Sequence, residues 1–202
     1  MDRKFLLSPA LAVASLLFAL SDASAVQYKI AGGSLDGNKL DPGLVINWQL
    51  SPYLAGKSFS LNDGQSATFD FFKIWTDESA VNADDKEQKS FSASLNFSDP
   101  FSTASLGGIT FGGTTWYGVD YAKLTWNSGP AMVSVNGLTY SVSLNDVIFN
   151  AGLNLGLTGM NNGAMVQATV KQISVPDNGS TAILLGVTLL VIALFYRRSA
   201  TV

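Results

Sequence analysis

The fold is decided by residues 131–144, which read AMVSVNGLTYSVSL. From residue 138 to residue 144 apolar and polar side chains alternate strictly, which is the period of a half-buried strand. The apolar-patterned run at residues 131–135 precedes Asn136-Gly137, the short-range signal for a two-residue type I′ turn. These residues therefore predict a β-hairpin.

The same pattern extends through the central part of the chain. Residues 91–97 alternate in the same way, and no long stretch spaces its apolar residues as a helix would. Asn62-Asp63-Gly64 and Asn161-Asn162-Gly163 predict turns, as do Gly107-Gly108 and Gly112-Gly113. Strand signals recur about every 10 residues, which predicts an all-β, antiparallel β-sandwich of jelly-roll-like type. The further predicted strands are residues 45–50, 67–75, 114–119, 122–126 and 164–173.

The first 25 residues have the organisation of a secretory signal peptide. Arg3 and Lys4 precede an apolar stretch at residues 10–20, and Ala23-Ser24-Ala25 offers small residues to a signal peptidase. The apolar stretch is about half of the ~20 residues that a membrane-spanning helix needs. We therefore expect export and cleavage after Ala25, with an uncleaved anchor as the alternative.

The C-terminal segment has three parts in a fixed order. Residues 175–181 read VPDNGST, residues 182–196 are apolar, and Arg197-Arg198 follows. This arrangement resembles the PEP-CTERM sorting signals of exported bacterial proteins, most closely their VPDSG-type variant. Asn178 stands where that variant usually has Ser. The matching residues are Val175, Pro176, Asp177, Gly179, Arg197 and Arg198, and the last four residues, 199–202, form a short tail.

The resemblance also implies how the protein is held and processed after export. It implies a membrane-anchored precursor, held at the inner membrane by a hydrophobic C-terminal helix and processed by an exosortase-like protease. As a helix, the 15 apolar residues would reach only about 22 Å, which is short for a ~30 Å hydrocarbon layer. Pro176 favours an extended, accessible motif. The residues alone leave open a tail anchor that is never cut.

The region between these signals, residues 26–174, has the length of one domain. Its 8 Lys and 12 acidic residues give a net charge of −4, and it has no Arg, so a nucleic-acid partner is not expected. The whole chain has no Cys and no His. Thiol chemistry, a Ser-His-Asp triad and a His-bearing zinc site are thereby excluded.

The densest acidic segment is residues 77–87, which lies between two aromatic-rich runs. Asp77, Glu78, Asp84 and Asp85 are candidate Ca²⁺ ligands, because this ion prefers several carboxylate and carbonyl oxygens. The spacing does not match an EF-hand loop, which needs a Gly at its sharp turn. The alternative is a solvated connecting loop without a cofactor.

Aromatic residues beside glycines form the second candidate site. Trp116, Tyr117 and Tyr121 lie near Gly112-Gly113 and Gly118, and Asp120 could accept hydrogen bonds from sugar hydroxyls. This set is a candidate glycan platform. The alternative is that the rings fill the core of the sandwich, since aromatic residues are favoured in strands.

Without His, the remaining enzymatic route is a pair of carboxylates, as in glycoside hydrolases. Asp70, Asp77, Glu78 and Asp120 are the candidates, but nothing in their linear spacing pairs them. We therefore expect a non-enzymatic protein of structural or adhesive type at the cell surface or in the extracellular matrix. The alternatives are an exopolysaccharide-binding module and a small hydrolase. PEP-CTERM proteins commonly occur in bacteria that make exopolysaccharide, which implies a role in a biofilm matrix.

Overall fold

The computed structural model describes residues 25–127, 129–174, 186 and 188–189. The chain divides into a β unit, Ala25–Val175, and a second unit of Met1–Ser24 with Pro176–Val202. In the second unit Gly186, Thr188 and Leu189 are helical. The predicted signal peptide, the sorting motif and the rest of the predicted C-terminal helix lie outside the described residues. Within the described part, no helix has both the length and the apolar character that a membrane span requires.

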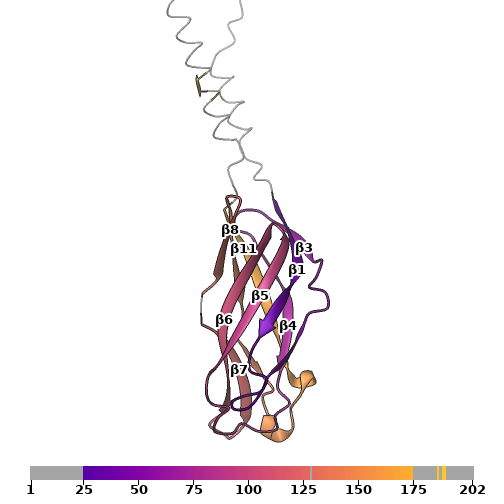
Figure 1. Cartoon of the computed structure of the whole chain (residues 1–202), viewed down its shortest axis with the longest axis vertical. Coiled ribbons are helices and arrows are strands. Elements are labelled where there is room, and N and C mark those ends of the chain that lie inside the picture. The colour runs from indigo at the N-terminus through magenta and orange to yellow at the C-terminus, as the bar shows by residue number, and fades with distance from the viewer. Residues whose placement is uncertain (1–24, 128, 175–185, 187, 190–202) are drawn as a thin grey trace, which may run out of the picture. The chain divides into compact units, whose positions relative to one another are not determined.

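The described part of the β unit forms two antiparallel sheets, which confirms the predicted all-β class (Figure 1). Sheet A contains, in spatial order, β10 (Val147–Phe149), β7 (Asp120–Trp126), β6 (Phe101–Thr114), β5 (Lys89–Asp99), β1 (Val26–Asp36) and β3 (Ser58–Leu61). Sheet B contains, in spatial order, β2 (Asn47–Leu50), β4 (Ser66–Trp75), β11 (Ala164–Ser174), β9 (Leu138–Leu144) and β8 (Ala131–Val135). Two short 3-10 helices, η1 (Leu153–Leu155) and η2 (Met160–Asn162), lie between β10 and β11.

The core lies between the sheets, where alternate residues of each strand point inward. Aromatic rings join the two layers: Phe72 on β4 and Phe91 on β5 have centroids 5.7 Å apart. Tyr140 on β9 packs edge-on against Phe97 on β5, at 5.2 Å. Burying each such ring stabilises the fold by about 1.5–3 kcal/mol, so these aromatic contacts contribute strongly to the packing of one sheet on the other.

The hairpin predicted at residues 131–144 is confirmed. Val135 pairs with Leu138 at its tip, and the backbone φ angles of Asn136 and Gly137 are 52° and 79°. Positive φ at both positions is what a type I′ turn requires. β9 then pairs with the long final strand β11, which places the hairpin at one edge of sheet B.

Two predictions from the sequence are wrong at strand β6. Residues 115–119 form a turn, so the strand predicted at 114–119 is wrong beyond Thr114. Gly107-Gly108 and Gly112-Gly113, predicted as turns, lie inside β6. The reason is close packing: a Cβ at Gly108 would lie 2.7 Å from the Thr125 carbonyl oxygen, and one at Gly112 would lie 2.8 Å from Val81. Gly108 therefore permits close approach of the β7 backbone, and Gly112 permits close approach of the Val81 side chain.

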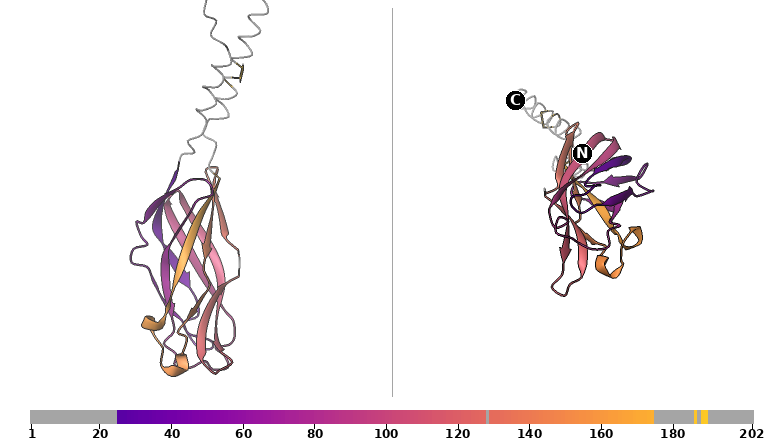
Figure 2. Two further views of the ribbon diagram at one scale, coloured as in Figure 1. Left: turned by 180° about the vertical axis from the view of Figure 1, so that it is seen from behind. Right: turned by 60° about the horizontal axis from the view of Figure 1, so that its bottom comes forward.

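Both chain ends of the β unit lie at one end of the sheets, which we call the terminal end. There Val26 pairs with Leu61, Ser174 pairs with Thr139, and the Tyr28 hydroxyl donates to the Gln172 side chain. The two 3-10 helices lie at the opposite end (Figures 1 and 2). We call this opposite end the loop end, and it comprises residues 37–46, 76–88, 115–119 and 150–163.

Candidate functional site

The most exposed aromatic residues of the loop end lie on the turn between β6 and β7. This aromatic turn, residues 115–119, is closed by the Thr115 amide donating to the Val119 carbonyl at 2.8 Å. The Gly118 amide donates back to the Thr115 carbonyl at 2.9 Å. Trp116 is 95% exposed and Tyr117 is 64% exposed, with ring centroids 5.2 Å apart. The turn therefore presents two large rings to solvent on a hydrogen-bonded base.

Asn154, on η1, holds the aromatic turn and the start of β7 through two side-chain hydrogen bonds. Its amide Nδ2 donates to the Gly118 carbonyl at 2.6 Å, and its Oδ1 accepts the Asp120 backbone N–H at 3.1 Å. The Gly152 amide donates to the Asp120 carbonyl at 2.7 Å. These three bonds tie the turn to the 150–163 segment, so the two rings are held by a rigid support.

Asp120 and Tyr121 have different surroundings from the two exposed rings. Asp120 is 7% exposed, and its carboxylate accepts the Thr114 hydroxyl at 2.8 Å and the Val81 amide at 3.0 Å. The Tyr121 ring covers Gly113, where a Cβ would lie 2.5 Å from it. Of the four predicted glycan residues, the structure brings Trp116 and Tyr117 to the surface, encloses Asp120 beside the turn and packs Tyr121 over Gly113.

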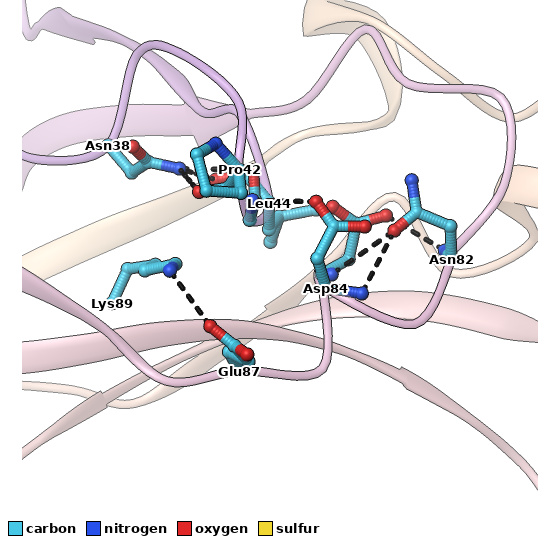
Figure 3. Close-up of polar contacts among 9 residues, drawn as sticks. Asn38, Pro42, Leu44, Asn82, Asp84, Glu87 and Lys89 are labelled. Atoms are coloured by element: carbon cyan, nitrogen blue, oxygen red, sulfur yellow. Dashed lines mark hydrogen bonds and ion pairs between the residues drawn. The ribbon is translucent and has the colours of Figure 1, made fainter.

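The acidic segment is fastened to residues 37–47 by carboxylates that accept hydrogen bonds. Glu78 Oε1 accepts the Val45 amide at 2.6 Å, and Asp77 Oδ2 accepts the Asn47 side-chain amide at 2.9 Å. Asp84 Oδ2 accepts the Gly43 amide at 2.9 Å. Figure 3 shows Asp84 between Asn82 and the Pro42–Leu44 stretch, so this acidic loop, residues 76–88, is ordered by its own carboxylates.

The four predicted calcium ligands are therefore engaged with separate donors. Across the part of the chain that the structure describes, no three His, Cys, Asp or Glu side chains gather closely enough to hold a metal ion. Of the other three, Asp85 lies near enough to Glu78 for its charge to help raise the pKa of Glu78. Calcium binding stays a prediction from the sequence.

Glu78 and Asp85 form a close pair of like charges. Asp85 is 0% exposed; its Oδ2 accepts the Asn82 amide at 2.8 Å, while Oδ1 has no hydrogen-bond partner among the described residues. Burial raises the pKa of Glu78 to about 7, assisted by the nearby charges of Asp85 and Asp41. The hydrogen bond from the Val45 amide opposes that rise.

The carboxylates considered for hydrolysis do not converge. Asp70, on the exposed side of β4, accepts the Gln167 side-chain amide at 3.0 Å. Asp120 is enclosed at the start of β7, in the other sheet, and Asp77 and Glu78 bind residues of the 37–47 segment. Each of the four thus has a partner that fixes local structure.

Three polar residues that join distant segments through side-chain hydrogen bonds could not be recognised from the sequence. Asn150 is 1% exposed, and its side chain accepts the Thr76 amide at 3.0 Å and donates to two carbonyls of the following loop. Asn154 braces the aromatic turn, and Gln172 is buried at the terminal end. In a sequence, Asn in a loop looks like an ordinary turn former, because its distant partners are not visible.

Comparison with protein-family models, curated proteins and solved structures gives no match for this chain. The aromatic turn of the loop end therefore carries the functional proposal below.

Proposed function

We propose that this chain is an exported adhesive protein of the cell surface or extracellular matrix, sorted through its C-terminal signal and without a catalytic centre. The two terminal signals support export, through their resemblance to a signal peptide and to a PEP-CTERM tail. The precursor is anchored in the inner membrane by its C-terminal helix, and an exosortase-like protease then processes it.

The arrangement of the β unit supports this role. Val26 and Ser174, the first and last strand residues of the β unit, both lie at the terminal end, opposite the loop end that carries the aromatic turn. We also propose that the two sheets form a jelly-roll-like sandwich, since the chain passes repeatedly from one sheet to the other.

One observation carries the adhesive function: Trp116 is 95% exposed on a turn held by several hydrogen bonds. Leaving a large ring in water gains nothing for folding, whereas a ring on a rigid support loses little entropy when it binds. Large aromatic side chains also dominate the energy of contact surfaces. The aromatic turn is thus the contact surface of the molecule.

The same observation favours a second, narrower function, the binding of exopolysaccharide. The aromatic turn consists of Thr, Trp, Tyr, Gly and Val, and it has no charged side chain. The faces of the rings suit the apolar faces of neutral sugars, and the Tyr117 hydroxyl can donate or accept a hydrogen bond. A neutral polysaccharide is the ligand that this surface fits.

Export is tested by site-directed labelling, because the chain contains no cysteine. Ser92 is exposed on β5, so a Ser92→Cys variant offers one reactive thiol. A membrane-impermeant maleimide should label this variant on intact cells. Labelling that requires lysis of the cells would contradict a surface location.

Adhesion is tested with Trp116→Ala in a pull-down on the exopolysaccharide of the producing cells. Phe101→Ala is the matched control, because Phe101 is 87% exposed but lies beside the Asp99–Lys29 pairing at the terminal end. We expect Trp116→Ala to lose at least tenfold in binding at an unchanged melting temperature, while Phe101→Ala binds normally. Equal binding by both variants would remove the aromatic turn as the contact surface.

A further inference from the structure

Strand β8 (Ala131–Val135) forms an unprotected edge of sheet B. Among the described residues it pairs only with β9, so its other side has no strand beside it. The sequence contains no charged residue between Lys123 and Asp146, so this edge is uncharged. Proteins usually protect an edge with a charged side chain or a very short strand, because unpaired backbone groups attract another strand.

The other three edge strands that the structure describes have such protection. β10 has three residues, and the Asp146 carboxylate just before it accepts the Trp126 amide at 3.0 Å. β2 has four residues, and Lys39 lies 4.0 Å from the centroid of its Trp48 ring. β3 also has four residues and directly follows Lys57. β8, with five residues, is thus the longest of these edges and the one without a nearby charge.

The hairpin turn determines which backbone groups of β8 point outward. Val135 and Leu138 flank the two-residue turn, so they form a hydrogen-bonded pair, and such pairs alternate along an antiparallel ladder. Val133 therefore directs its N–H and C=O toward β9, whereas Met132 and Ser134 direct theirs away from it. The Met132 side chain is 60% exposed, so solvent reaches this edge.

A second copy of β8 satisfies all of these outward groups when it lies antiparallel with Val133 opposite Val133. In this register Met132 of each copy lies opposite Ser134 of the other, and each such pair exchanges two N–H···O=C bonds. On the inner face, the two half-buried Val133 side chains meet as a closely spaced pair. We propose that the chain forms a symmetric dimer through β8, in which sheet B continues from one copy into the other.

The two ends of β8 suit this register. Pro130 has no N–H and ends the pairing on one side, and the Asn136-Gly137 turn ends it on the other. In the symmetric pair, Pro130 of one copy lies opposite Asn136 of the other. Each end therefore meets a position that needs no strand partner, which is why a second copy fits the edge along its whole length.

The surface beside β8 also allows a second copy to approach. β7 pairs only with residues 108–114 of β6, so residues 101–107 extend past it in sheet A. Ser102 in this stretch bonds the Tyr140 hydroxyl at 2.6 Å, and Tyr140 pairs with Val133. Residues 101–107 have no charged side chain, so this neighbouring stretch does not repel a second copy.

The dimer keeps both aromatic turns accessible. β8 lies at the terminal end, away from the loop end (Figure 1). Because the two β8 strands run antiparallel, the loop ends of the two copies point in opposite directions. If the proposed function holds, such a dimer carries two polysaccharide sites and can join two polymer chains, with greater avidity than one site. The pairing itself does not depend on that function.

Disulfide crosslinking tests the register, because the chain has no cysteine of its own. In the proposed dimer the two Val133 Cα atoms lie about 4.5 Å apart, within the range that a disulfide spans. A Val133→Cys variant of the full chain, in mild detergent with a mild oxidant, should therefore give covalent dimers. Ile148→Cys is the matched control, since Ile148 is 57% exposed on another edge strand, β10. No dimers in Val133→Cys, or equal dimer yields in both variants, would overturn the proposal.

A proline at position 132 tests whether the backbone makes the contact. Met132→Pro removes an outward N–H but no hydrogen bond to β9, whereas Met132→Ala keeps that N–H. In the Val133→Cys chain, Met132→Pro should lower the dimer yield about tenfold relative to Met132→Ala, because two of the four hydrogen bonds between the copies are lost. Equal yields at equal melting temperatures would contradict edge pairing.

Amide hydrogen exchange of the unmodified chain needs no variant. The Met132 and Ser134 amides should exchange rapidly in dilute solution and more slowly as the protein concentration rises. Protection that is equally strong at every concentration would mean that another segment of the same chain covers β8. Rapid exchange at every concentration would mean that the edge stays open. Either result would overturn the proposal.

Discussion

Replacing Asn150 with Ala should be among the most damaging single changes at the loop end. Its side chain accepts the Thr76 amide at 3.0 Å and donates to the carbonyls of Leu157 and Gly159, at 3.1 and 3.0 Å. These bonds join the start of the acidic loop to the segment that follows η1. They are enclosed, since Asn150 and Thr76 are 1% and 0% exposed.

The magnitude follows from these contacts. Three hydrogen bonds at about 1 kcal/mol each give about 3 kcal/mol. The φ of Asn150 is 48°, a left-handed conformation that Ala adopts at a cost of about 1 kcal/mol more than Asn. The total is about 4 kcal/mol of unfolding free energy, and Asn150→Gly, which relieves the backbone, should lose about 3 kcal/mol.

Urea denaturation of both variants measures this loss. The midpoint should fall with little change in the slope, and the melting temperature of Asn150→Ala should drop by about 8–16 °C. Asn161→Ala is the control, because Asn161 is exposed in the neighbouring turn, and it should change stability by less than about 0.5 kcal/mol. A loss below about 1 kcal/mol in Asn150→Ala would refute the reasoning.

Two further changes test the packing and the support of the aromatic turn. Gly112→Ala should lower the free energy of unfolding by about 1–3 kcal/mol, because its Cβ would lie 2.8 Å from Val81. Gly107→Ala is the control, since a Cβ there would have nothing within 4 Å, and it should lower that free energy by less. Equal losses in thermal melts of the two variants would contradict the packing argument. Asp120→Asn should weaken polysaccharide binding in the pull-down, although Trp116 is retained. The reason is that an amide cannot accept both hydrogen bonds that the carboxylate accepts, from the Val81 amide and the Thr114 hydroxyl. Unchanged binding would mean that the aromatic turn does not need these hydrogen bonds.

The sequence predicted those strands in which local pattern and tertiary environment agree. The hairpin at residues 131–144 is an example, since its alternation and its Asn136-Gly137 turn need no distant partner. β6 could not be predicted, because its glycines look like turn signals. Gly108 and Gly113 are required by neighbours on β7 and Gly112 by Val81 on the acidic loop, which only the fold brings close, whereas Gly107 has no neighbour within 4 Å.

The candidate site was predictable to the same degree. Trp116 and Tyr117 were recognisable as aromatic residues beside glycines, and the structure brings them to the surface. The support from Asn154 and the enclosure of Asp120 were not predictable, because they depend on contacts from segments more than 30 residues away in the chain. The hydrogen bonds that Glu78 and Asp84 accept from Val45 and Gly43 were not predictable either, because they need the fold of the whole acidic loop.

The measurement that tests the central proposal most directly is the mass of the mature protein recovered from the cell surface. The proposal predicts a chain that begins at Val26 and ends within or just after the motif at residues 175–179, without the apolar segment. Recovery from the surface of a chain that continues through Phe195 to Arg198 would contradict sorting by cleavage.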